Sequence, residues 1–255
     1  MANDRLRDAI LRNGLTPGAV AEKIGVDPKT VERWITQDRT PYPRHRHAIA
    51  AVVREDVPYL WPKAVTPERA SKIGQSELLQ IYSRRSSVPY DLWGRLIERA
   101  EERIDVLAYA GLFLVEQDPQ LVDVLRQKGA DGVEVTILLG DPTSEAIERR
   151  SVEEGAPGLM AAKIGQVQQY YNRLEGAPGV TVLYHDTTLY NSIYRFDDEM
   201  LVNMHVLGRH APHAPVMHLR RLNGGDLFGT YADSFDRVRK ASKPQPGGER
   251  GEVAA

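Results

Sequence analysis

The stretch IGVDPKTVERW, residues 24–34, combines a turn with the start of a short amphipathic helix. Gly25 can adopt the left-handed backbone conformation at no steric cost, so it suits a tight turn. Asp27 is a favourable helix N-cap, and Pro28 suits the first helical position because its missing N–H is not needed there. The stretch therefore predicts a turn followed by a helix that begins at a defined residue.

One face of this predicted helix is apolar. Val31, Trp34 and Ile35 recur at positions i, i+3 and i+4, which directs them towards a core. The other side chains point outward or sideways in the register that Asp27 fixes. These side chains belong to Pro28, Lys29, Thr30, Glu32 and Arg33.

Further short helices are predicted on both sides of this stretch. Residues 4–13 have apolar side chains at helical spacing, and Thr16-Pro17 has the composition of a second helix start. Apolar residues between 48 and 53 predict another helix before Asp56. We expect a compact helical domain at residues 1–62.

Segment 4–56 resembles the lambda-repressor/Cro-like helix-turn-helix family, and LTPGAVAEKIGVDPKTVERWITQ (15–37) is the central part of the resemblance. The resemblance implies a regulator that binds double-stranded DNA at a palindromic operator as a homodimer. Lys29 and Arg33 can donate to guanine, and Glu32 can accept from cytosine. The residues expected to contact DNA are Thr16, Pro28, Lys29, Thr30, Glu32, Arg33, Gln37, Arg39 and Arg44. The alternative is that these helices are only a packing unit.

Composition limits the class of protein. A chain of 255 residues with 42% hydrophobic content is long enough for two domains with separate cores. The absence of cysteine excludes disulfides and thiolate metal sites, and the net charge of −2 argues against a non-specific polyanion binder. We find no signal peptide and no apolar run of membrane-spanning length. The expected compartment is the cytoplasm.

The rest of the chain predicts an α/β domain. Residues 63–88 are expected to be a linker, within which Leu78, Leu79, Ile81 and Tyr82 can form a short packing helix. Strands and helices alternate across 89–242, which predicts a sheet with covered faces. Expected strands include 104–115, 133–141 and 180–185, followed by a hairpin around Asp197-Asp198. We expect residues 243–255 to be a disordered tail.

The hairpin LYNSIYRFDDEMLVN, residues 189–203, resembles the phospholipase D-like superfamily, whose motif is His-x-Lys, four residues and then Asp. Asp197 matches the motif's Asp, but Tyr190 stands at the position of the nucleophilic His and Ser192 at that of the Lys. Residues 90–242 also resemble sensor-type domains that follow helix-turn-helix segments in actinobacterial regulators. The resemblance implies a catalytically inactive domain that dimerises and binds a small-molecule effector, because the groups for phosphohistidine chemistry are missing.

The candidate ligand-binding residues share a place near this hairpin or at the end of a predicted strand. They are Tyr109, Asp141, Tyr190, Ser192, Arg195, Asp197, Asn203 and His205. Each has an alternative role: Asp197 as a turn residue, Tyr109 as core and Arg195 in a surface ion pair. The histidines His205, His210, His213 and His218 lack a carboxylate in register, so we expect neither a metal site nor a cofactor.

Two other functions remain open. The chain can be a DNA-targeted phosphodiesterase or nuclease that uses another nucleophile, such as His185 or His205. It can also be a DNA-bound scaffold that dimerises without a ligand.

Overall fold

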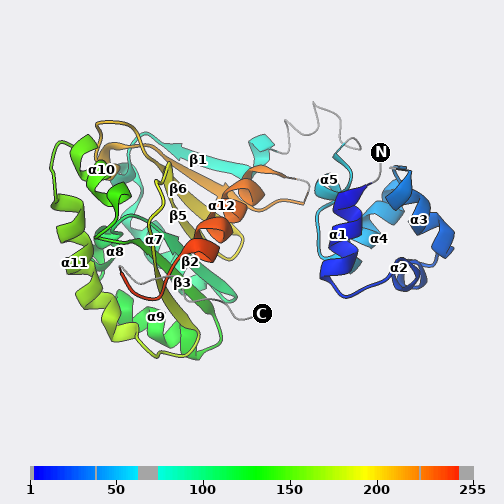
Figure 1. The fold of residues 1–255 in the computed structure, drawn as a ribbon, viewed down its shortest axis with the longest axis horizontal. Helices are drawn as coiled ribbons and strands as arrows, with labels where there is room; N and C mark the ends of the chain where they lie inside the picture. Colours follow the sequence, from blue (N-terminus) through cyan, green and yellow to red (C-terminus); the bar gives the residue numbers. More distant parts are fainter. Residues whose placement is uncertain (1–2, 38, 63–73, 224, 247–255) are drawn as a thin grey trace. The chain divides into compact units, whose positions relative to one another are not determined.

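The computed structural model describes residues 3–37, 39–62, 74–223 and 225–246. The chain divides into two compact units. Unit 1 comprises Met1–Glu77 with Arg221–Leu227, and unit 2 comprises Leu78–Arg220 with Phe228–Ala255. Figure 1 shows unit 1 as a group of helices and unit 2 as a sheet with helices. None of the helices in the described part of the chain is both long and apolar enough to cross a membrane.

Unit 1 is built from short helices. Their bounds are α1 (Asp4–Arg12), α2 (Pro17–Ile24), α3 (Pro28–Thr36), α4 (Pro43–Val53) and α5 (Val57–Leu60). The two helix starts expected from the sequence are present, since Thr16 Oγ1 accepts from Ala19 N at 3.1 Å and Asp27 Oδ1 accepts from Lys29 N at 2.8 Å. Gly25 ends α2 in the left-handed conformation, with φ of 70°.

A small apolar core holds these helices together. Val31, Trp34 and Ile35 of α3 are buried, as their spacing predicts. They pack with apolar residues of the other helices, namely Leu6, Ala9, Ile10, Val20, Ala21, Ile49, Ala50, Val53, Leu60 and Trp61. Burial of one face of α3 fixes which of its side chains remain in solvent.

Unit 2 contains a mixed seven-stranded sheet, in the order β1-β7-β6-β5-β2-β3-β4. Strands β2, β3 and β4 are parallel, and the remaining pairings are antiparallel. The strands are β1 (Leu78–Tyr82), β2 (Arg103–Leu107), β3 (Glu134–Gly140), β4 (Val180–His185), β5 (Asn191–Phe196), β6 (Glu199–Met204) and β7 (Val216–Arg220). The α/β architecture expected for this part of the chain is present.

Helices cover both faces of the sheet. Their bounds are α7 (Tyr90–Arg99), α8 (Leu112–Gln117), α9 (Leu121–Ala130), α10 (Glu145–Glu153), α11 (Leu159–Tyr171) and α12 (Leu227–Ala241), with short 3₁₀ turns η2 (Arg85–Ser87), η3 (Asn172–Leu174) and η4 (Ala211–His213). Tyr194 of β5 contacts Trp93 of α7, and the next residue, Arg195, lies over the Phe228 ring of α12. Successive side chains of a strand point to opposite faces, so α7 and α12 cover opposite sides.

The structure corrects three expectations. Residues 78–82 form an edge strand antiparallel to β7, not a helix in a linker. The run expected as one strand at 104–115 is a strand, a left-handed Gly111 with φ of 64° and then α8. Lys243, expected in a disordered tail, pairs with Tyr184 at the outer edge of β4. Linker residues 63–73 and tail residues 247–255 lie outside the described residues.

Candidate nucleic-acid interface and buried histidine cluster

The solvent face of α3 carries polar side chains in a fixed register. Lys29, Glu32 and Arg33 are exposed, whereas the residues on the opposite side of the helix are buried. The Asp27 cap and the Gly25 turn determine where this helix begins. This face presents two cations and one carboxylate, groups that can donate to guanine or accept from cytosine.

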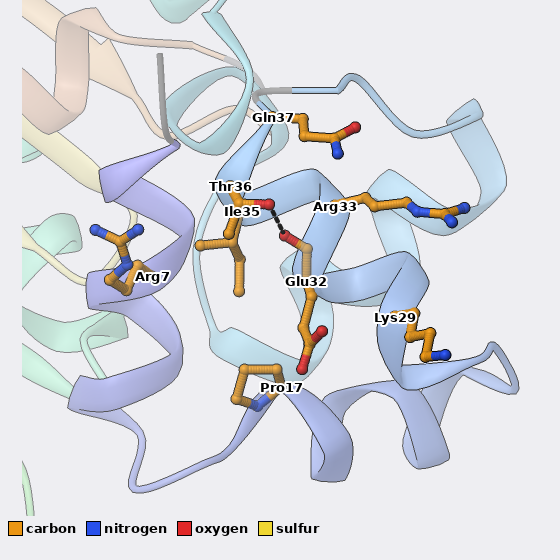
Figure 2. A pocket seen from close by; sticks show the side chains of 8 residues that line it. All are labelled: Arg7, Pro17, Lys29, Glu32, Arg33, Ile35, Thr36 and Gln37. Atoms are coloured by element: carbon orange, nitrogen blue, oxygen red, sulfur yellow. Dashed lines mark hydrogen bonds between the residues drawn. The ribbon is translucent and has the colours of Figure 1, made fainter.

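A hollow of about 560 Å³ lies against this face of α3 (Figure 2). Its walls are Arg7, Pro17, Lys29, Glu32, Arg33, Ile35, Thr36 and Gln37. Four of these residues belong to the predicted DNA-contacting set. Arg7, Pro17 and Thr36 are not expected from the sequence: α1 and the start of α2 reach this place only through packing against α3, and Thr36 lies at the end of α3, beyond the residues expected to face DNA.

The other predicted DNA-contacting residues lie outside the lining of this hollow. Thr16 caps α2 and Pro28 opens α3, while Thr30 is half-buried on α3. Arg39 is exposed, and Arg44 is exposed in the first turn of α4. All of these except Thr30 are exposed and therefore accessible to a partner.

A buried polar cluster lies in unit 2 at the edge where β2, β3 and β4 end. Tyr109 follows β2, and its hydroxyl accepts from Leu189 N at 2.8 Å. The Tyr109 ring stacks on that of His205, with centroids 5.3 Å apart. His205 Nδ1 lies 3.1 Å from Leu189 O, and its Nε2 lies 3.0 Å from Ser192 Oγ. The structure thus brings together three predicted ligand residues, Tyr109, Ser192 and His205.

Hydrogen bonds identify the neutral tautomer of His205. A carbonyl oxygen can only accept, so Nδ1–H donates to Leu189, and Nε2 is left to accept from the Ser192 hydroxyl. Burial lowers the pKa of His205 to about 4. The ring is therefore a hydrogen-bonding neutral group near pH 7.

His185 and Asp141 lie at the same edge but are engaged locally. Burial lowers the pKa of His185 to about 4, and its ring nitrogens face Ala108 O and Thr187 N, each at 3.3 Å. Asp141 Oδ1 accepts from Thr143 N at 2.9 Å and from Thr143 Oγ1 at 2.7 Å. These contacts give Asp141 a role in the strand-to-helix turn.

Asp197 and Arg195 do not join this cluster, contrary to expectation. Both lie towards the opposite end of the hairpin, at about 10 Å (Arg195) and about 16 Å (Asp197) from Ser192 at the usual rise per strand residue. Asp197 is in the turn with φ of 49°. Its carboxylate accepts from three backbone N–H groups, those of Glu101, Glu102 and Arg103, at 2.7 to 2.9 Å.

Arg195 is occupied near the same end of the hairpin. Its Nε donates to Asp197 O at 2.9 Å, and Nη1 lies 3.6 Å from the buried Asp105. Burial raises the pKa of Asp105 to about 6, against the opposing effect of Arg195 and Arg103. The structure therefore assigns Arg195 and Asp197 to local stabilisation of the hairpin.

Tyr190 and Asn203 differ sharply in exposure. Tyr190 is 82% exposed, and its carbonyl accepts from His205 N at 2.9 Å. Val206 and Leu207, which follow His205 in the chain, are 39% and 78% exposed. Asn203 is fully buried, and its Oδ1 has no hydrogen-bond partner in the structure.

Two arginines near the cluster were not expected from the sequence. Arg85 lies over the Phe113 ring and hydrogen-bonds Tyr194, and burial lowers its pKa. Arg150 is buried and pairs with Glu154 at 2.7 Å. Neither arginine belongs to a recognisable motif, and only the folded chain brings them near His205.

The histidines considered for metal binding have separate partners. His210 Nδ1 is 2.7 Å from Glu154, and His218 Nε2 is 2.6 Å from Glu199. Among the residues that the structure describes, no group of three or more potential ligands is placed to hold a metal ion.

Comparisons with known proteins give distant similarities of fold. No family model matches the chain. No curated protein matches it either. Similar solved structures include the archaeal chromatin protein TrmBL2, described as showing a novel mode of DNA binding, with 14% identity and a TM-score of 0.41 over 86% of this chain and 72% of that one.

Two further solved structures are also similar. Nuc from Salmonella typhimurium, a phospholipase D family member, is 13% identical with a TM-score of 0.38 over 66% of this chain and 97% of its own. NucT from Helicobacter pylori is 9% identical with a TM-score of 0.39 over 65% and 98%. Similarities at this level assign neither an activity nor a partner to this chain.

Proposed function

We propose that this chain is a sequence-specific DNA-binding transcriptional regulator. Unit 1 acts as a helix-turn-helix domain, with α2 and α3 as its two helices and α3 entering the major groove. Unit 2 forms a homodimer and binds a small-molecule effector without cutting phosphodiesters. The observation that carries the proposal is the exposed face of α3, where Lys29, Glu32 and Arg33 stand in a register fixed by Asp27.

Charge placement supports the role of α3. The exposed face of α3 carries the hydrogen-bond donors Lys29 and Arg33 in two adjacent turns. On the other face, Val31, Trp34 and Ile35 are buried in the core of unit 1. Cations at base-edge positions give specificity, whereas Gln37, Arg39 and Arg44 lie where phosphate contacts can fix the docking.

The DNA-binding proposal is tested by selection and mobility-shift assays with the full chain. We expect one duplex sequence to bind roughly 10³-fold or more tightly than random DNA at physiological salt. Replacing Lys29 or Arg33 with Ala is expected to relax preference at individual base pairs. Equal binding to selected and random duplexes would contradict the proposal.

The homodimer and effector proposals rest on the edge that carries the histidine cluster. Tyr190, whose carbonyl accepts from His205 N, and Leu207, two residues after His205, carry large exposed apolar side chains near this edge, which suits contact with a second copy. A two-fold axis is what a palindromic operator requires. A small molecule that binds one arrangement of the dimer better than another shifts DNA affinity by linkage.

The effector proposal is tested by a thermal-shift screen of metabolites and nucleotides. A binding compound is expected to raise the melting temperature of the full chain and to lose that effect in His205→Ala. Unchanged melting across the screen favours a DNA-bound scaffold that dimerises without a ligand.

A phosphodiesterase is the second candidate, because His205 and Ser192 are hydrogen-bonded at 3.0 Å. Such a pair can activate a nucleophile. However, Ser192 is buried, and burial lowers the pKa of His205 to about 4, which makes it a weak base at pH 7. Turnover of bis(4-nitrophenyl) phosphate that His205→Ala abolishes would establish the enzyme and replace the effector proposal.

A further inference from the structure

Three arginines on α1 have different surroundings, although they lie on the same short helix. Arg5 Nη1 donates to Tyr59 O at 3.1 Å, and Arg12 Nη2 lies 2.9 Å from Glu55 Oε1. Both therefore bind the segment at the end of α4 and in α5. Arg7 instead lines the hollow beside α3 (Figure 2). Packing thus separates one arginine of α1 from the other two.

Backbone packing explains the position of Arg7. Asn3 N donates to Ile35 O at 2.6 Å, so the start of α1 is attached to the last turn of α3. One helical turn after Asn3, Arg7 reaches the wall of the hollow opposite Glu32 and Thr36. Pro17, at the start of α2, closes the same hollow.

The hollow carries an excess of positive charge. Its lining includes the cations Arg7, Lys29 and Arg33 and one carboxylate, Glu32. An anionic partner is therefore favoured over a neutral or cationic one. Of these cations, Lys29 and Arg33 extend from α3 itself, whereas Arg7 approaches from a neighbouring helix.

Arg7 is held by an ion pair that a partner can replace. Its Nη1 lies 2.7 Å from Asp4 Oδ1, and the two side chains are 45% and 71% exposed. Such a pair between exposed groups three residues apart on a helix contributes little to stability, because solvent screens it. A phosphate oxygen offers a stronger, charge-assisted hydrogen bond to the same guanidinium.

We propose that Arg7 is a DNA phosphate contact that fixes the orientation of α3 in the groove, and that Asp4 competes with the phosphate for it. The inference rests on the proposed DNA-binding function. With α3 against base edges, the sugar–phosphate strand beside it passes over the hollow, and Arg7 meets a backbone oxygen. This contact carries no sequence information.

The test measures DNA affinity of the full chain by fluorescence anisotropy from low to physiological salt, with the selected duplex and a random duplex. Arg7→Ala is expected to weaken binding to both by roughly 3- to 10-fold and to reduce the slope of log K against log salt by about 1. Arg7→Lys restores the slope. Asp4→Asn strengthens binding by roughly 2-fold, because it releases the guanidinium.

Arg12→Ala is the matched control, since Arg12 is an exposed, ion-paired arginine on the same helix. It is expected to leave affinity and salt slope unchanged. The inference is overturned if Arg7→Ala keeps the wild-type salt slope, or if Arg12→Ala reduces the slope equally. If circular dichroism shows that Arg7→Ala does not fold, the Asp4→Asn variant decides instead. The inference expects that variant to bind DNA more tightly than the wild type, and no gain in affinity overturns it. If the wild-type chain binds the selected and the random duplex equally, the proposed DNA-binding function itself is rejected.

Discussion

Gly25 has a backbone conformation that other residues rarely adopt, and it connects the two helices of the proposed DNA-binding motif. Its φ is 70°, and a Cβ there would meet no atom within 4 Å, so only backbone strain opposes substitution. We expect Gly25→Ala to lower the unfolding free energy of unit 1 by about 1 kcal/mol. Urea denaturation followed by fluorescence reports this, because Trp34 and Trp61 lie in the core of unit 1.

Gly18→Ala provides the control for this prediction. Gly18 lies inside α2, and a Cβ there would meet Thr16 Oγ1 at 3.8 Å, which is an ordinary contact. Alanine favours helix over glycine, so the unfolding free energy should rise by up to about 1 kcal/mol. If both substitutions destabilise unit 1 equally, the left-handed conformation is not the cause.

Asp197 stabilises the hairpin turn by accepting three backbone hydrogen bonds. Burial opposes ionisation, but the N–H groups of Glu101, Arg103 and Glu102, with Arg195, lower the pKa of the Asp197 carboxyl. Asp197→Ala is expected to reduce the unfolding free energy of unit 2 by about 2 kcal/mol at pH 7. Urea denaturation of both proteins measures the difference.

The part of the Asp197 effect that depends on ionisation must disappear in acid. Because the folded pKa is below the unfolded value, the contribution is complete above the unfolded pKa, about 4, and is lost as pH falls through the folded pKa. Asp197→Asn is the matched variant, since asparagine tolerates the left-handed φ and keeps one acceptor oxygen. An Ala variant that remains equally destabilised at pH 2 would contradict this account.

At the scale of elements, the ends of β4 and β6 carry histidines that are neutral in the folded chain. Burial lowers the pKa of His185 and His205 to about 4, whereas an unfolded histidine titrates near 6.5. Between these values the unfolded chain binds more protons. Stability is therefore complete above about pH 6.5 and falls as pH is lowered towards 4, by up to about 1.4 kcal/mol per pH unit for each histidine.

Equilibrium unfolding at pH 7.5 and at pH 5 measures this dependence. His205→Gln is expected to remove part of it, because glutamine carries no titrating proton. His47→Gln, at an exposed position on α4, serves as the control and should leave the dependence unchanged. Burial raises the pKa of Asp105 to about 6, so that carboxyl opposes part of this dependence. A dependence that His205→Gln leaves unchanged would contradict the account of a neutral His205.

Element types were predictable where one residue forces the local backbone. Asp27-Pro28 fixed the start of α3, and Asp197-Asp198 fixed the β5–β6 turn, because caps and turns depend on local chemistry. The strand at 78–82 was missed because a short apolar run suits either a helix or a strand, and pairing with β7 decides between them. The apolar run 104–115 predicts one strand, but the left-handed Gly111 ends the extended segment and α8 begins directly after it.

At the scale of the whole molecule, the proposed homodimer predicts a specific sensitivity. Leu207→Asp places a charge on a side chain that is 78% exposed in the single chain and buried in the proposed dimer. We expect the dissociation constant to rise by roughly 10-fold or more, since an unpaired charge in an apolar interface is costly. Sedimentation equilibrium measures it. The Leu207→Asp variant should bind DNA with two half-sites more weakly than the wild type does. It should bind DNA with a single half-site as tightly as the wild type does.

The control for the dimer is Leu11→Asp, because Leu11 is 65% exposed on α1 in unit 1. It should leave the oligomeric state unchanged. A wild-type chain that sediments as a monomer at micromolar concentration would end the dimer proposal, but it would leave DNA contact by α3 open.

The sequence alone determined helices α1 to α4 of unit 1, the outward face of α3 and the general alternation of strands and helices in unit 2, whereas α5 was not expected. These features follow from periodicity, caps and turns, which act over a few residues. Tertiary structure decided which distant residues meet: Arg7 with α3, Tyr109 with His205, and Asp197 with the start of β2 rather than with Ser192. Strand order and helix packing set those distances, and no local pattern encodes them.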